Sequence, residues 1–266
     1  IVGNKNDNQV GQVVLCSSKN LTDWKFEGKV LPTVDDDPTS DLHPSQVIER
    51  PKVIYNEKTG KFVMWMHIES PDYEKAHAGV AVCDSPTGTF TYLGSFKPNG
   101  ADSRDQTIFK DDDGKAYHIY ASEDNSTLHI SELTDDYTAC SGNYARFFVG
   151  RFMEAPAMFK KDGKYYLIMS GCTGWAPNPG RSAVASSIWG PWKELANPFV
   201  GADSETSFHS QSTYVLPVPG KPGQFIYMGD RWTPKNAIDG RYIWLPIRFE
   251  GEQPVIEWLD EWGIEN

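Results

Sequence analysis

A hairpin motif recurs four times along the chain at similar intervals, and this recurrence constrains the fold more than any other feature of the sequence. Each copy has a strand end, a Gly-containing turn and an aromatic-rich strand. The copies are NEKTGKFVMWMH (56–67), KDDDGKAYHIYAS (110–122), KKDGKYYLIMSG (160–171) and PGKPGQFIYMGD (219–230). Their turn glycines, Gly60, Gly114, Gly163 and Gly223, are separated by 54, 49 and 60 residues. Asp or Lys beside Gly suits a tight turn that needs a positive φ, and a period of about 50 residues is typical of a β-propeller blade.

A second pattern interleaves with the first and supplies the outer strands of each unit. Ser near the start, a turn, an aromatic residue and then a strand occur in SSKNLTDWKFEGKVL (17–31), CDSPTGTFTYLGSF (83–96) and SSIWGPWKELANPF (186–199), with a degraded copy in ISELTDDYTACSG (130–142). Helical periodicity is almost absent, so the chain is predicted to be all-β. A fifth hairpin, projected back from Gly60 by one period, falls at or before residue 1. We therefore predict one domain, residues 1–266, that forms a five-bladed β-propeller whose first blade is incomplete at the N-terminus. A large β-sandwich is the alternative, but it does not explain the regular spacing.

Composition narrows the classes of function. The formal net charge of −11 and the pI of about 5.0 argue against nucleic-acid binding, because such a surface repels phosphates. No window approaches the roughly 18 consecutive apolar residues of a membrane span. The four cysteines lie far apart and are predicted to be small buried apolar residues, with one disulfide as the open alternative. Nine Trp and twelve Tyr beside abundant Asp and Glu suit a carbohydrate site, since sugar rings stack on aromatic faces and their hydroxyls need acceptors.

Polar residues stand at similar places before the four hairpins. They are Glu49, Asp105, Glu154 and Gln211, and each precedes a short apolar strand by a few positions. The inner strands of propeller blades converge on one axial depression. The sequence therefore predicts that these four side chains face a common axial pocket.

Each of these polar residues has a purely structural alternative. Glu154 could be a solvated turn residue. Glu49 is followed by Arg50 and could form an ion pair with it. Asp105 could pair with Arg104 or cap a turn, and Gln211 could satisfy buried main-chain groups in the central channel.

Two or three carboxyl groups in an aromatic-walled pocket indicate glycoside hydrolysis. That reaction needs a protonated acid for the leaving oxygen and a second group that acts on water or attacks directly. Apolar residues flank Glu154 on both sides, and an apolar surround and a neighbouring carboxylate such as Glu49 both raise the pKa of an acid. His209 is predicted to be a core histidine. No GxSxG, Walker A or HExxH motif occurs, and no metal or cofactor is expected.

Several motifs carry a family resemblance. ERPKVIYN, SRDQTIF, MEAPAMFK, DGKYYL and SQSTYV resemble glycoside hydrolase family 43, most of all its branch of exo-β-1,3-galactanases (galactan 1,3-β-galactosidases), over essentially the whole chain. The resemblance implies a five-bladed propeller and an inverting mechanism. It implies that Glu154 is the general acid and that Glu49 orients this acid and tunes its pKa. In place of the usual Asp base it implies the amide of Gln211, either as such or as its imidic acid tautomer. The residues that the resemblance implies in contact with the terminal galactose are Asp105, Tyr73, Thr173, Trp175 and Asp230.

The N-terminus departs from this pattern. The chain begins without Met in an apolar stretch, so we expect a segment upstream, and a His-Gly-Gly element that relatives carry there is missing. Where relatives tend to have a Glu, the sequence reads Val2, Gly3, Asn4, which bears on specificity or activity.

The sequence as a whole predicts an exo-acting enzyme that releases terminal galactose from β-1,3-galactan chains, as in arabinogalactans. We expect a secreted, periplasmic or cell-surface monomer whose partner is an oligo- or polysaccharide. The alternatives are an α-L-arabinofuranosidase or β-xylosidase of the same broad family, and a non-catalytic carbohydrate-binding propeller.

Overall fold

The computed structural model describes residues 2–3, 13–233 and 240–264, and within these ranges the chain is all-β. The only helical segments described are two three-residue 3-10 turns, Pro98–Gly100 and Ser204–Thr206. This confirms the predicted all-β class. No helix in the described ranges has the length and apolarity that a membrane span requires.

The chain divides into two compact units. The first comprises Ile1–Asp124 with Ser131–Tyr144, and the second comprises Asn125–Ile130 with Ala145–Asn266. Each unit contains antiparallel sheets in which strands consecutive in sequence are neighbours, which is the connectivity of a propeller blade.

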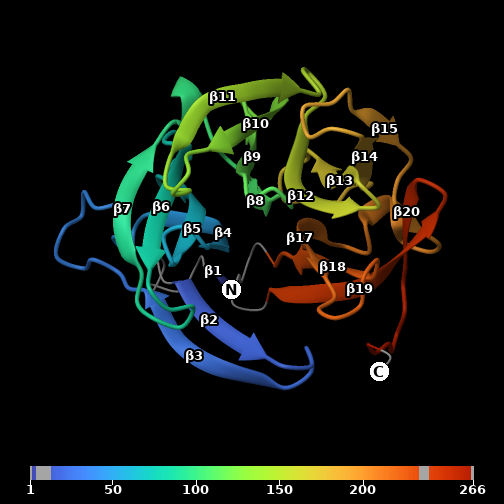
Figure 1. The fold of residues 1–266 in the computed structure, drawn as a ribbon, viewed down its shortest axis with the longest axis horizontal. Coiled ribbons are helices and arrows are strands. Elements are labelled where there is room, and N and C mark those ends of the chain that lie inside the picture. The colour runs from blue at the N-terminus through green and yellow to red at the C-terminus, as the bar shows by residue number, and fades with distance from the viewer. Residues whose placement is uncertain (1, 4–12, 234–239, 265–266) are drawn as a thin grey trace. The chain divides into compact units, whose positions relative to one another are not determined.

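The first unit contains two whole sheets and most of a third (Figure 1). The strands of the first sheet are β1 (Val2–Gly3), β2 (Val13–Ser18) and β3 (Trp24–Leu31). Those of the second are β4 (Val47–Asn56), β5 (Lys61–Glu69), β6 (His77–Cys83) and β7 (Thr91–Phe96). The third has the order β11-β10-β9-β8, with β8 (Gln106–Lys110), β9 (Ala116–Ser122), β10 (Thr127–Leu133) and β11 (Cys140–Phe147). The first residues of β10 and the last of β11 belong to the second unit.

The second unit contains two sheets (Figure 1). One consists of β12 (Met153–Lys161), β13 (Lys164–Gly171), β14 (Arg181–Ala185) and β15 (Lys193–Leu195). The other has the order β16-β20-β19-β18-β17, with β16 (Phe199–Val200), β17 (Gln211–Pro217), β18 (Phe225–Arg231), β19 (Arg241–Glu250) and β20 (Gln253–Glu257). Strand β16 pairs in parallel with β20, whereas the other pairs are antiparallel.

The structure shows four complete blades, whereas the prediction was five blades of which the first is incomplete at the N-terminus. Four sheets contain four or five strands each, whereas the N-terminal sheet contains three described strands, the first of which is two residues long. The additional blade was predicted by extending the repeat period back from the first hairpin. Of this blade, mainly the outer strands β2 and β3 lie within the described chain.

The four predicted hairpins are confirmed. Gly60, Gly114, Gly163 and Gly223 lie in the turns β4–β5, β8–β9, β12–β13 and β17–β18. Their φ values of 69°, 81°, 74° and 82° lie in the left-handed region, which glycine enters without a steric penalty.

Burial along each blade follows the apolar content of its strands. The second strands β5, β9 and β13 are almost continuously buried, whereas the outer strand β11, CSGNYARF, is mostly exposed. Apolar clusters of buried side chains form the cores of both units: Met64 and Trp65 belong to two such clusters in the first unit, and Phe159 and Tyr227 belong to one in the second. Because the second strand of each of these blades is buried on both faces, it fixes the register of the first strand, which carries the predicted site residues.

The first strands of three blades carry a β-bulge close to the predicted site residues. In β4 the register shifts between Glu49 and Lys52, and in β12 it shifts between Glu154 and Ala157. The residue after each glutamate has a positive φ: 53° for Arg50 and 51° for Ala155. A bulge re-aims side chains where it interrupts the ladder. Glu49 and Glu154 therefore occupy equivalent places in their blades, as the sequence register predicted.

Candidate active site

In the first unit, Glu49 lies at the end of a chain of charged groups. It is directly opposite His67 in the β4–β5 ladder, and its Oε2 lies 3.3 Å from His67 Nδ1. Its Oε1 accepts a hydrogen bond of 3.0 Å from the hydroxyl of Tyr73. The predicted site residues Glu49 and Tyr73 are thus brought together, and the Tyr73 hydroxyl is already engaged by this carboxylate.

The chain of charges continues from His67 to Glu69 and Arg104. Nε2 of His67 lies 3.2 Å from Oε2 of Glu69, which is also 3.4 Å from Nη1 of Arg104. Burial opposes the charge on His67, but Glu49 and Glu69 together raise the pKa of His67 to about 9. Burial also opposes the charge on Glu69, but hydrogen bonds from His67 and from main-chain amides lower its pKa to about 2. At neutral pH the imidazolium therefore lies between two carboxylates.

The second predicted acid of this unit, Asp105, forms an ion pair with Arg50. Nε of Arg50 lies 2.8 Å from Oδ1 of Asp105, and Nη2 lies 3.4 Å from Oδ2. The two structural alternatives paired Glu49 with Arg50 and Asp105 with Arg104, whereas the structure pairs Arg50 with Asp105 and Arg104 with Glu69.

In the second unit, two amides contact the Glu154 carboxylate. Nδ2 of Asn125 donates a hydrogen bond of 2.8 Å to Oε1. Nε2 of Gln211 lies 3.5 Å from Oε2, at the limit of a hydrogen bond. The apolar neighbours Met153 and Ala155, with exposed fractions of 1% and 2%, belong to the buried core. The apolar run in the sequence therefore builds the core, while the side chain of Glu154 meets polar groups.

The amide of Gln211 has a defined orientation. Its Oε1 lies 3.3 Å from Nε1 of Trp232, and its Nε2 lies 3.0 Å from the hydroxyl oxygen of Ser170. An indole N–H can only donate, so the atom that faces Trp232 must be the amide oxygen. Gln211 therefore presents its NH₂ group to Glu154 and Ser170. These contacts are with side chains, which differs from the alternative in which Gln211 satisfies buried main-chain groups.

Two tryptophans form an exposed aromatic pair beside Gln211. The rings of Trp175 and Trp232 are 5.5 Å apart at an angle of 76°, with exposed fractions of 50% and 36%. The Thr173 hydroxyl donates 2.7 Å to the carbonyl of Ala176 and accepts 2.7 Å from Asn178. It therefore fixes the loop that carries Trp175, and the exposed ring faces offer a stacking surface of the kind that sugars use.

The remaining predicted site residues have mixed outcomes. Asp230 is half-buried and pairs with Gln211 in the β17–β18 ladder. His209 is exposed, so the prediction of a core histidine was wrong; it lies in the irregular segment before β17 with a φ of 57°. Asn4, at which the N-terminal departure was noted, lies outside the described residues.

The cysteines do not behave as the sequence predicted. All four are free, Cys172 is exposed and the other three are half-buried. Burial and the neighbouring Glu154 raise the pKa of the Cys172 thiol to about 11. Cys172 therefore lies against the candidate acid as a neutral thiol at physiological pH.

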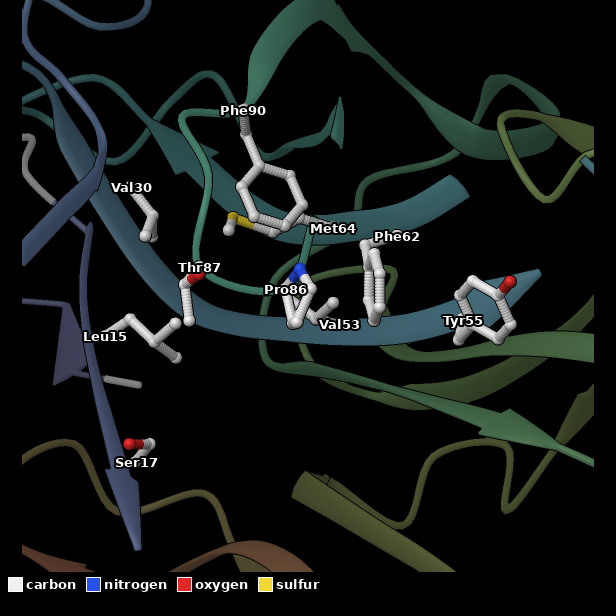
Figure 2. Close-up of a pocket in the computed structure, with 10 residues that line it drawn as sticks. All are labelled: Leu15, Ser17, Val30, Val53, Tyr55, Phe62, Met64, Pro86, Thr87 and Phe90. Atoms are coloured by element: carbon white, nitrogen blue, oxygen red, sulfur yellow. The ribbon is translucent and has the colours of Figure 1, made fainter. Parts of the chain in front are cut away.

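A cavity of the first unit lies elsewhere and has a different chemistry. It has a volume of about 370 Å³ and shares no lining residue with the carboxylate cluster (Figure 2). Figure 2 shows Leu15, Val30, Phe62, Met64 and Phe90 around it, with hydroxyls at its edge. It offers no carboxylate to a sugar. In the described part of the chain, no three His, Cys, Asp or Glu side chains are grouped as a metal site.

Sequence reasoning missed the residues that support the predicted ones. Asn125 donates a hydrogen bond to Glu154, and Trp232 contacts Gln211. Glu49 contacts His67, which is linked in turn to Glu69 and Arg104. His67 could have been found in the ladder, since pairing β4 with β5 through the Gly60 hairpin and allowing for the bulge places it opposite Glu49. Asn125 carries no such signal, because it lies in a turn outside the repeated motifs.

Comparisons with known proteins agree on one family. The family described as "Glycosyl hydrolases family 43" matches residues 3–242. Among solved structures, a family-43 β-1,3-galactosidase with galactodeoxynojirimycin is 44% identical, with a TM-score of 0.92 over 96% of this chain and 88% of that one. An exo-β-1,3-galactanase from Phanerochaete chrysosporium with β-1,3-galactotriose is 38% identical, with a TM-score of 0.90 over 97% of this chain and 59% of that one.

A curated relative gives a more distant match. The β-D-galactofuranosidase xynD of Aspergillus niger is 27% identical over 130 residues, which is 48% of this chain and 37% of that protein. The chain therefore spans less than two thirds of the length of this relative, and 59% of the Phanerochaete enzyme.

Proposed function

Because the chain belongs to glycosyl hydrolases family 43, we propose that it is an inverting exo-glycoside hydrolase that releases terminal galactose from β-1,3-galactan chains. The observation that carries this proposal is the pairing of Glu154 with the amide of Gln211, at 3.5 Å, where an inverting glycosidase usually has a second carboxylate. The galactan-acting enzymes to which the chain is similar at 38–44% identity support the choice of substrate.

Glu154 is proposed as the general acid. Its Oε1 accepts a hydrogen bond of 2.8 Å from Nδ2 of Asn125, whereas its Oε2 lies 3.5 Å from Nε2 of Gln211. We assign the transferable proton to Oε2, since an oxygen that already accepts a strong N–H bond is the poorer place for it. When the bond between the anomeric carbon and the leaving oxygen breaks, this proton passes to that oxygen and Glu154 becomes a carboxylate.

Gln211 is proposed to hold or activate the attacking water. Its Oε1 lies 3.3 Å from Nε1 of Trp232, and an amide oxygen can accept two hydrogen bonds, so we propose that it also accepts one from the water. As the imidic acid tautomer, the amide would expose a basic nitrogen that takes a proton from the water. Glu49 is proposed to orient the acid and tune its pKa.

Substrate contacts are proposed for Asp105, Tyr73, Thr173, Trp175 and Asp230. The exposed rings of Trp175 and Trp232 support stacking on a sugar face. The bonds of Tyr73 to Glu49 and of Asp105 to Arg50 support a different contribution, in which these residues shape the pocket and offer their remaining lone pairs to sugar hydroxyls.

At the level of the chain, we propose one domain over residues 1–266, a five-bladed propeller in which β1–β3 is the incomplete first blade. The protein is proposed to act as a monomer outside the cytoplasm, as a secreted, periplasmic or cell-surface enzyme on polysaccharide. Both proposals follow from the sequence period and from the polymeric nature of the substrate.

Substrate screening tests the proposed activity. Oligosaccharides and aryl glycosides of galactose, arabinose and xylose are incubated with the protein, and released sugars are identified by chromatography. We expect galactose from β-1,3-linked galacto-oligosaccharides, one residue at a time from one end. Release of arabinose or xylose alone would replace the proposed substrate. Calorimetric binding of galactan with no product over days would instead support a carbohydrate-binding protein.

A further inference from the structure

His67 is a buried titratable residue to which the proposed reaction assigns no part. It lies on β5 directly opposite Glu49, and only 2% of the residue is exposed. Its two ring nitrogens face two different carboxylates, Glu49 at 3.3 Å and Glu69 at 3.2 Å. Because the side chain is sealed from solvent, these carboxylates largely determine its protonation state.

Glu69 is a fixed anion at the far end of this arrangement. It has no exposed surface, and its Oε1 accepts main-chain N–H bonds from Ser70, Lys75 and Ala76 at 3.0, 2.6 and 2.9 Å. Its Oε2 faces His67 and Arg104. A carboxylate that accepts several N–H bonds is held in its charged form, so Glu69 keeps its charge across the working range of pH.

The two carboxylates favour a proton on both ring nitrogens of His67: Nε2 is hydrogen-bonded to Glu69, and Nδ1 lies 3.3 Å from Glu49 at an ion-pair distance without hydrogen-bond alignment. A neutral imidazole has one N–H and one lone pair, so one of the two carboxylates would face a lone pair in a buried site. The imidazolium donates toward both. The four charges then balance, with Glu49 and Glu69 negative and His67 and Arg104 positive, which offsets the penalty for burying them.

We infer that His67 is a positioning residue, an imidazolium clamp that fixes the orientation of the Glu49 carboxylate from behind. This inference rests on the proposed function, in which Glu49 orients and tunes the acid. Tyr73 holds Oε1 of Glu49 and His67 faces Oε2, so the carboxylate has no freedom to rotate. Glu69 supplies the anion that keeps the clamp charged.

The other charged groups around this cluster are consistent with the clamp. Arg104 contacts Glu69 and the main-chain carbonyl of Tyr73. On β6, the residue paired with His67 is Ala78, and the neighbouring His77 interacts electrostatically with Glu69 and Lys75. The nearby Arg50 is neutralised by Asp105.

Nuclear magnetic resonance of the whole protein with ¹⁵N-labelled histidine tests the clamp independently of activity. We expect one imidazole to remain doubly protonated at pH 7 and to titrate near pH 9. Its signals should be absent from His67→Gln and should titrate at lower pH in Glu49→Gln. If the His67 ring is a neutral tautomer at pH 7, the inference is overturned.

Kinetics on β-1,3-galacto-oligosaccharide test the positioning role. We expect His67→Gln to lower kcat by about 10- to 100-fold, the scale of a displaced catalytic group, with KM changed little. In the wild-type protein, kcat should fall near pH 9 as His67 loses its proton, and this fall should be absent from His67→Gln. His43→Gln, a change at a half-buried histidine whose ring contacts the hydroxyl and the main-chain N–H of Ser45, is the matched control and should leave kcat unchanged.

The two arms separate the possible failures. If wild-type protein releases no galactose, the proposed function fails, and the titration of His67 still decides whether the clamp exists. If wild-type protein is active and His67→Gln retains its kcat and pH profile, the positioning role is wrong. A folded but slow His67→Gln, shown by circular dichroism and by an unchanged KM, supports it.

Discussion

At the scale of single residues, the molecule pairs each proposed catalytic group with a partner that fixes one of its atoms. Asn125 holds Oε1 of Glu154, Trp232 faces Oε1 of Gln211, and Tyr73 holds Oε1 of Glu49. In each case the other polar atom of the same carboxylate or amide faces another catalytic or charged group. Positions held in this way lower the entropy cost of reaching the transition state.

The first prediction concerns the proposed acid. Glu154→Gln keeps the shape and the acceptor oxygen for Asn125 but removes the transferable proton. We expect kcat on β-1,3-galactan to fall by about 10²- to 10⁴-fold, the usual contribution of a general acid, while circular dichroism and the thermal midpoint stay close to wild type. Turnover at the wild-type rate would remove Glu154 from the mechanism.

The second prediction concerns the orientation of Gln211. Trp232→Phe keeps an aromatic ring but removes the N–H that faces Oε1, and Ser170→Ala removes the hydroxyl at Nε2. Each should lower kcat by roughly five- to tenfold, since one hydrogen bond contributes about 1 kcal/mol. Because both act on one amide, their effects should be non-additive in a double-mutant cycle. Strict additivity would show that the two contacts act independently of Gln211.

At the scale of the strand, the bulges after Glu49 and Glu154 position the site. Alternation along an unbroken strand would send neighbouring side chains to opposite faces, and the left-handed conformations of Arg50 and Ala155 interrupt this alternation. The carbonyl of Ala155 also accepts a 2.5 Å bond from Ser212 on β17, which joins the strands that carry Glu154 and Gln211.

The third prediction tests the bulge in β12. Ala155 has a φ of 51° and is 2% exposed. Glycine enters this region freely, whereas a β-branched residue there is a genuine outlier. We expect Ala155→Gly to retain most activity and Ala155→Val to lower the free energy of unfolding by about 2 kcal/mol or more and to reduce kcat. Urea unfolding and initial rates measure both. Equal behaviour of the two variants would show that the bulge has no part in the site.

The sequence predicted the hairpins well because their signal is local. Gly60, Gly114, Gly163 and Gly223 each combine turn chemistry with flanking strands, and all four were found in turns. The bulges and the pairing of Arg50 with Asp105 were missed, since they depend on an inserted residue that no local propensity marks. His209 was misjudged because an apolar neighbour, Phe208, is buried while its own side chain is exposed.

At the scale of the whole molecule, stability should depend on pH through the buried charges of the first unit. The pKa of His67 is raised to about 9 and that of Glu69 is lowered to about 2. The contribution of His67 is fully present below its unfolded value of about 6.5 and is lost as the pH rises through 9. That of Glu69 is present above about 4.5 and is lost as the pH falls toward 2.

The fourth prediction follows from these two windows. We expect the free energy of unfolding to fall between pH 6.5 and pH 9, with His67 contributing at most about 1.4 kcal/mol per pH unit. In His67→Gln this alkaline decline should be shallower, while the decline on acidification should persist. Urea unfolding followed at several pH values measures both limbs. An identical alkaline decline in the variant would show that His67 is not the group that titrates.

The reaction mechanism determines the anomeric configuration of the released sugar. A single displacement by water inverts the anomeric centre, whereas a glycosyl-enzyme intermediate retains it. The proposed mechanism uses Gln211, which lies 3.5 Å from Glu154, instead of a nucleophilic carboxylate, so under this proposal water attacks the sugar directly.

The most direct test is the anomeric form of the first product, followed by proton NMR during digestion of β-1,3-galactan. The account predicts that α-galactose appears first and then mutarotates, and that Glu154→Gln produces neither anomer at a comparable rate. Initial release of β-galactose would contradict the inverting mechanism and the role of Gln211, and release of no galactose would contradict the proposed substrate.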